Sequence, residues 1–107
     1  MSAHFLVGDD GEPLGVVDID VIQARATVLG FELATFHDDP PEIDRVMAEA
    51  LTELGPEAFG YVAAAALRHV VENVVNPLMD VADAAGVGDS VHAGLVAAAR
   101  HAREVLS

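Results

Sequence analysis

The sequence predicts a mainly α fold, a small four- to five-helix, bundle-like domain with an N-terminal β-hairpin. Apolar residues recur at helical spacing over most of the chain after residue 20. Asp, Gly and Pro stand between these stretches, where they can cap or end a helix. A chain of 107 residues has the usual length of one domain, so we expect 1–107 to be a single domain.

Residues 1–17 are predicted to form the hairpin. Ala3–Val7 and Leu14–Val17 are short runs of strand-forming residues, and Asp10-Gly11 between them is a typical turn dipeptide. A two-stranded hairpin alone is only marginally stable in water. We therefore expect it to lie on the helices or to pair with the hairpin of a second copy.

The first helix is expected at 20–37. Asp20 and Gln23 fit a capping box at its start. Its apolar positions recur at steps of four and three residues, at Ile22, Ala26, Leu29, Leu33 and Phe36. This spacing indicates one buried helix face.

The second helix is expected at 40–54 and is the clearest amphipathic stretch. Asp39 can cap it, Pro40 suits its first turn, and Gly55 can end it. Acidic residues line the face opposite the apolar one. We take the acidic face as a speculative protein-binding surface made of Asp38, Asp39, Glu42, Glu49 and Glu53.

The third helix, expected at 56–75, is the most apolar, and the others should pack around it. Its apolar arc covers more than half of a helical wheel, whereas a surface helix shows a stripe of little over about 100°. Such a helix is normally covered from several sides. Its small residues, Gly60 and Ala64 among them, allow another helix to approach closely, so we also assign these two to a speculative dimer contact.

Two further helices are expected at 77–85 and 89–106. Asn76-Pro77 should kink or break the chain, because proline disfavours a helical residue before it. Asp89 or Ser90 can cap the last helix. Its apolar stripe comprises Val91, Leu95, Ala98, Ala102 and Val105.

Composition limits the possible functions. The chain has no cysteine, which excludes disulfides and thiolate metal sites. Its formal net charge is −13, and residues 9–57 contribute −11 of it, with thirteen acids against two arginines. A field of this sign repels phosphate backbones, so we expect no direct binding of nucleic acid. We also expect no membrane span and, without a visible signal peptide, a cytoplasmic location.

Sequence motifs for catalysis are not found. Neither a phosphate-binding loop nor a nucleophile elbow nor a HExxH helix is present. His37, Asp38 and Asp39 could hold a cation, but helix capping explains the aspartates more simply. We therefore expect no enzyme activity, no metal and no cofactor.

The resulting hypothesis is a non-catalytic acidic protein that acts through protein–protein contact and forms a homodimer. Its size and charge fit an accessory protein of a phage or mobile element that modulates a host factor, through a partner with a basic surface. One alternative is a nucleic-acid mimic whose carboxylates occupy a basic site. Another is a helical bundle that binds a metal or a small ligand.

Overall fold

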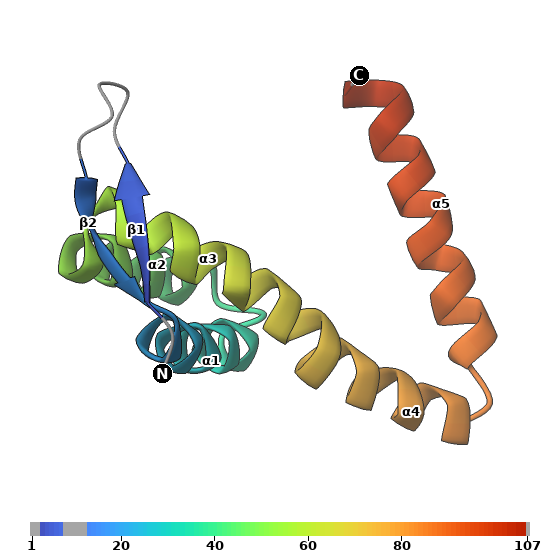
Figure 1. Cartoon of the computed structure of the whole chain (residues 1–107). Coiled ribbons are helices and arrows are strands. Elements are labelled where there is room, and N and C mark those ends of the chain that lie inside the picture. The colour runs from blue at the N-terminus through green and yellow to red at the C-terminus, as the bar shows by residue number, and fades with distance from the viewer. Residues whose placement is uncertain (1–2, 8–12, 107) are drawn as a thin grey trace. The chain divides into compact units, whose positions relative to one another are not determined.

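The computed structural model describes the backbone of residues 3–7 and 13–106 and the side chains of residues 18–106. The described part is mainly helical, as predicted, and bundle-like (Figure 1). The chain divides into two compact units, residues 1–71 and residues 72–107, and each is described by itself. The single domain expected for 1–107 stays a prediction.

The N-terminal segment contains two antiparallel strands, β1 (Ala3–Val7) and β2 (Pro13–Asp18). Ala3 pairs with Asp18 and Phe5 with Val16, and the register shifts between Leu6 and Val7. The turn predicted at Asp10-Gly11 lies outside the described residues. The hairpin as a whole therefore stays a prediction.

The first unit contains three helices, α1 (Ile19–Thr35), α2 (Pro40–Leu54) and α3 (Pro56–Val70). Both α1 and α2 pack against α3, and they also contact each other. Their shared core consists of Ala26, Leu29, Val46, Val62 and Ala66. These are small or medium side chains, so each buries little area and the core is thin.

Local signals set the helix ends. Asp39 caps α2, because its carboxylate accepts from the Glu42 N–H at 3.3 Å, and Pro40 stands in the first turn. Gly55 ends α2 with φ 82° and ψ 161°, a backbone conformation that favours glycine. The predicted cap of α1 is wrong: the N-cap is Asp18, whose carboxylate accepts from the Asp20 N–H at 3.0 Å. Asp20 instead lies in the first turn, where the helix dipole favours its charge.

Helix α1 crosses α3 closely at Gly30. A Cβ there would lie 2.9 Å from Cδ2 of His69 and 3.3 Å from Val70. The neighbouring Phe31 meets the His69 ring edge-on, with centroids 4.7 Å apart and an interplanar angle of 87°. Glycine at position 30 thus permits the approach of the two helices.

Helix α3 is less enclosed than predicted. Within the first unit only its Val62 and Ala66 are buried, while Leu67 is 74% exposed and Val71 also faces outward. The expectation of cover from several sides is wrong for this unit, because α1 and α2 cover only part of the apolar arc. The rest of that arc is not covered by residues of the first unit.

Of the kink or break predicted at Asn76-Pro77, the break does not occur: a π-helical segment, Val71–Val75, leads directly into α4 (Asn76–Ala84). Proline lacks an N–H and collides with the carbonyl four residues before it, here that of Asn73. The wider π turn, Val71–Val75, includes Asn73 and so accommodates the proline. Asn76 is consequently helical, contrary to the prediction.

The second unit contains α4 and α5 (Gly88–Leu106). The two helices are close at the turn that connects them and diverge from there (Figure 1). Gly86, with φ 79°, forms a Schellman motif: its N–H donates to Asp83 and the Val87 N–H donates to Ala82. Helix α5 begins at Gly88, before the predicted caps. A Cβ at Gly88 would collide with the Asp83 side chain, so glycine allows the close approach of α4 and α5.

Candidate functional site

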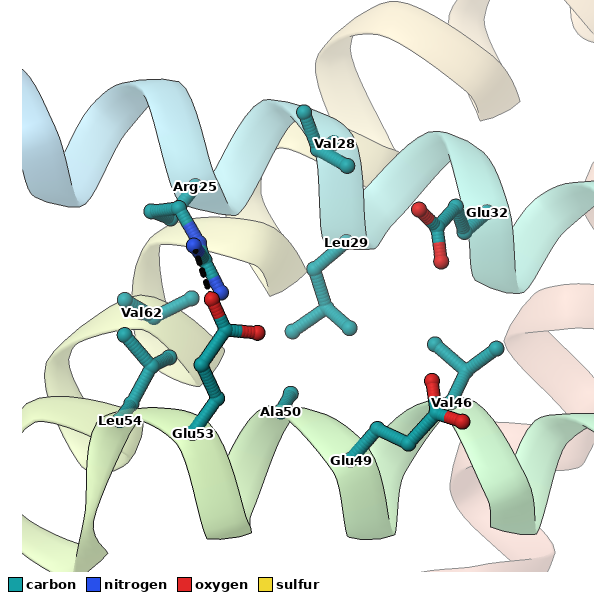
Figure 2. Close-up of a pocket in the computed structure, with 10 residues that line it drawn as sticks. All are labelled: Arg25, Val28, Leu29, Glu32, Val46, Glu49, Ala50, Glu53, Leu54 and Val62. Carbon is teal, nitrogen blue, oxygen red and sulfur yellow. Dashed lines mark hydrogen bonds and ion pairs between the residues drawn. The ribbon is translucent and has the colours of Figure 1, made fainter.

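A groove of about 310 Å³ lies between α1 and α2, with Val62 of α3 in its lining. Its floor is apolar and includes Leu29, Val46, Ala50 and Leu54. Figure 2 shows Leu29 pointing from α1 into the space between the two helices, toward Val46 and Ala50 on α2. We call this the acid-rimmed groove, because its charged lining residues are Glu32, Glu49, Glu53 and Arg25.

Helical spacing places these charges on the rim. On α1, Arg25 and Glu32 lie four residues before and three residues after Leu29, which puts all three on one face. On α2, Glu49 and Glu53 are one turn apart beside the floor residues Val46 and Ala50. Each helix therefore contributes an apolar row and a charged row to the groove. The four rim groups together carry a formal charge of −2.

An ion pair spans the groove at one end. The Arg25 guanidinium donates to Glu53 Oε1 at 2.7 Å and so links α1 to α2 (Figure 2). The hydrogen bond and the charge of Glu53 raise the pKa of Arg25. The same bond and the charge of Arg25 lower the pKa of Glu53. The rim thus already holds one guanidinium.

A second set of ion pairs, centred on Arg45, lies along α2. Arg45 lies 2.7 Å from Glu42 and 3.0 Å from Glu49, at the i,i+3 and i,i+4 spacings that favour such pairs. Its guanidinium carbon is also 5.9 Å from the centroid of the Phe36 ring. Hydrogen bonds to both glutamates raise the pKa of Arg45. The charge row of α2 is therefore partly neutralised within the chain.

The five residues of the predicted acidic face have three different roles in the structure. Glu49 and Glu53 line the acid-rimmed groove, and Glu42 pairs with Arg45. Asp39 caps α2, and Asp38 lies in the turn before it, so the structure does not bring these two to the groove. Sequence reasoning missed Arg25 and Glu32. The signal available in the sequence was their helical spacing, which places both residues on the same face as Leu29.

A second hollow of about 440 Å³ is lined almost entirely by apolar side chains. It shares Leu29 with the acid-rimmed groove, and Met47, Leu67 and Val70 also line it. The predicted dimer residues Gly60 and Ala64 are exposed on α3, and a Cβ at Gly60 would meet no atom within 4 Å. Both positions are accessible to a partner, and their role in a dimer stays a prediction.

Neither a metal centre nor a membrane span is found in the described part of the chain. No three His, Asp or Glu side chains there come together as ligands for a metal ion. None of the helices described combines the length and the apolar character needed to cross a bilayer.

Comparison with known proteins found no relative of this chain. No protein-family model matches the chain, and searches of curated proteins and of solved structures likewise gave no match. A function has to be argued from the groove and the exposed surface alone.

Proposed function

We propose that this protein is a non-catalytic acidic protein that works in the cytoplasm by protein–protein contact, and that it holds a basic amphipathic segment of a partner in the acid-rimmed groove. The observation that carries the proposal is the combination of an apolar floor with a carboxylate rim. An apolar side chain can enter between Leu29 and Ala50 while a neighbouring cation meets Glu32 or Glu49. Partner helices commonly dock in this way, with apolar anchors in a groove.

The size of the groove limits what can bind there. Drug-sized ligands usually occupy pockets of roughly 300–1,000 Å³, so a hollow of about 310 Å³ is at the lower end of that range. One or two side chains of a peptide fit this space better than a cofactor does. Leu67, which lines the apolar hollow that shares Leu29 with this groove, would extend the contact.

Arg25 indicates which cation the rim accepts. Its guanidinium binds a rim carboxylate from a neighbouring helix, as an arginine of a partner helix would. Exposed ion pairs contribute little to stability, so an incoming arginine can share or replace the Arg25–Glu53 pair at little cost. The size and charge of the chain remain compatible with an accessory protein of a phage or mobile element.

The nucleic-acid mimic has less support. A mimic needs a row of uncompensated negative charge, whereas Glu42, Glu49 and Glu53 each share an arginine of the same chain. The small-ligand alternative would use the apolar hollow beside Met47 and Leu67. That hollow offers few polar groups to orient a ligand, so we favour the peptide.

Titration of fluorescently labelled helical peptides tests the proposal. The probe is a 14-residue peptide with leucine and arginine four residues apart, and its matched control carries glutamate in place of arginine. The probe should bind with an affinity that falls as salt rises, and the control should not bind. Replacing Glu32 and Glu49 by Gln should weaken binding several-fold.

The control variant is Glu57→Gln, which removes an exposed acid of α3 that does not line the groove. It should bind the probe like the wild type. Equal binding by the Glu32/Glu49 double variant and the wild type would contradict the groove as the site. Competition by heparin for a natural partner would instead favour mimicry.

A further inference from the structure

The second unit cannot form a core from its own residues. It has 36 residues, and below about 40 residues a fold usually needs disulfides, metals or oligomerisation. The chain contains no cysteine, and the described residues contain no metal-ligand group. Among the described residues of this unit, only Gly88 is buried. Something beyond this unit must cover its apolar side chains.

The apolar surface is large enough for an interface. Eight large aliphatic side chains of the described residues in this unit are between 41% and 83% exposed: Leu78, Val81, Val87, Val91, Leu95, Val96, Val105 and Leu106. A standard interface buries roughly 800 Å² on each partner, so most of these side chains would have to contribute to it. Seven of them lie on α4 and α5, and Val87 lies in the connection between these helices.

Helix α5 carries its apolar residues in a heptad pattern. Val91, Leu95, Ala98, Ala102 and Val105 recur at steps of four, three, four and three residues. This repeat places the five residues along one face of the helix, which we call the α5 seam. Helices with such a repeat pack side by side along this face. At about 28 Å, α5 is long enough for several layers of such contacts.

We propose that two copies of the chain pair through their α5 seams, with the two α5 helices antiparallel. An antiparallel register in which Leu95 meets the partner's Ala98 also sets Val91 against the partner's Ala102. Every layer combines a large residue with a small one, which fills space evenly. A parallel pair would set Leu95 on Leu95 beside layers of alanine on alanine, which leaves gaps.

Charge also favours a second copy at this surface. Residues 72–107 hold five acids and two arginines, a net of −3, whereas residues 1–71 hold thirteen and three, a net of −10. On α5 the only acids, Asp89 and Glu104, stand near opposite ends, and residues 90–103 contain none. Over residues 90–103, two copies can therefore meet at the α5 seam without apposed carboxylates.

The antiparallel arrangement makes the helix ends complementary. It sets the first turn of one helix, with Asp89, beside the last turns of the other, with Arg100 and Arg103. The helix dipoles are then opposed as well. The exposed α4 residues Leu78 and Val81 can add to the contact between the two copies. The pairing is independent of the acid-rimmed groove, which lies wholly in residues 1–71.

Sedimentation of the full chain tests the pairing. The mass should rise from 11.1 kDa to about 22 kDa with concentration, and the dimer should tighten with salt, because salt screens the repulsion of two acidic chains. Leu95→Glu, in the seam, should weaken the dimer at least roughly 100-fold because it buries a carboxylate. Ala97→Glu on the outer side of α5 is the matched control and should dimerise. Ala64→Glu on α3 distinguishes the α5 pairing from a dimer contact through Gly60 and Ala64, and under the α5 pairing it should leave the dimer intact.

A wild type that stays monomeric at every concentration and salt would overturn the proposal. Equal loss of dimer in Leu95→Glu and Ala97→Glu, or loss only in Ala64→Glu, would also overturn it. Disulfides test the orientation without disturbing the fold much. Because the chain has no native cysteine, an equimolar mixture of Leu95→Cys and Ala98→Cys chains should give a mixed disulfide. Cross-linking of Val91→Cys with itself would contradict the antiparallel register.

Discussion

Residues 1–71 and residues 72–107 are equally apolar but differ in what they bury. In the first unit 37 of 71 residues are apolar, and in the second 19 of 36. The first unit encloses Leu29, Val46 and Val62 between three helices, whereas the large apolar residues of α5 are exposed. Apolar composition therefore does not determine burial. A helix pair has one inner face, and a third element is needed before side chains such as Leu29 are enclosed on all sides.

Burying a charge in the first unit should have the largest effect. Ala66 is 4% exposed on α3, so Ala66→Asp places a carboxylate in the core without a partner. The cost is several kcal/mol, comparable with the whole stability of a small domain. Far-UV circular dichroism should show that the cooperative thermal unfolding of the first unit is lost. The control Ala64→Asp, at an exposed position of the same helix, should melt close to the wild type.

Leucine truncation compares the two units directly. Leu29 is 5% exposed, and Leu29→Ala should cost about 2–5 kcal/mol in urea unfolding, independently of protein concentration. Leu95 is 54% exposed, so the effect of Leu95→Ala should be small in dilute solution and should grow with protein concentration as the dimer forms. A large, concentration-independent loss at Leu95 would show that the second unit is covered within its own chain.

Loss of the α2 cap should have an intermediate effect. Asp39→Ala removes the acceptor of the Glu42 N–H and should cost about 1 kcal/mol. The neighbouring Asp38→Ala, in the exposed turn, is the matched control and should change the free energy of unfolding by less than about 0.5 kcal/mol. Similar losses in the two variants would count against the cap.

The Arg25–Glu53 pair should have the smallest effect, visible in its pH dependence. Arg25 lowers the pKa of Glu53 in the folded state, so the pair stabilises the fold above the ordinary glutamate pKa. This contribution is lost as the pH falls through the lowered pKa. The difference in melting temperature between the wild type and Glu53→Gln should therefore be greatest near pH 7 and disappear in acid. A difference that grows as the pH falls would contradict the pair.

The sequence predicted the helices well where a local signal defines an end. Asp39-Pro40 and Gly55-Pro56 bound α2 at the predicted residues, because capping and backbone conformation depend on neighbours in the chain. Asp18 and Asp20 are two chemically equal cap candidates two residues apart, and the sequence alone did not distinguish them.

The candidate site could be predicted only in part. The row of acids on α2 was visible, but Arg25 and Glu53 are 28 residues apart and meet only because α1 packs beside α2. The apolar arc of α3 is too wide to show which side its neighbours cover. The π segment at Val71–Val75 depends on how the chain accommodates Pro77, for which the sequence offers two solutions, a break or a wider turn.

The most direct test compares hydrogen exchange of the full chain between the wild type and Leu95→Glu. It asks whether the core of the first unit is covered within one chain while the apolar side chains of the second unit are covered by another copy. At a concentration where the wild type is dimeric, the amides of α5 should lose protection in Leu95→Glu. The amides around Leu29, Val46 and Val62 should stay protected, because that core lies within one chain. Unchanged protection of α5 in the variant, or a matching loss in α1 to α3, would contradict the account.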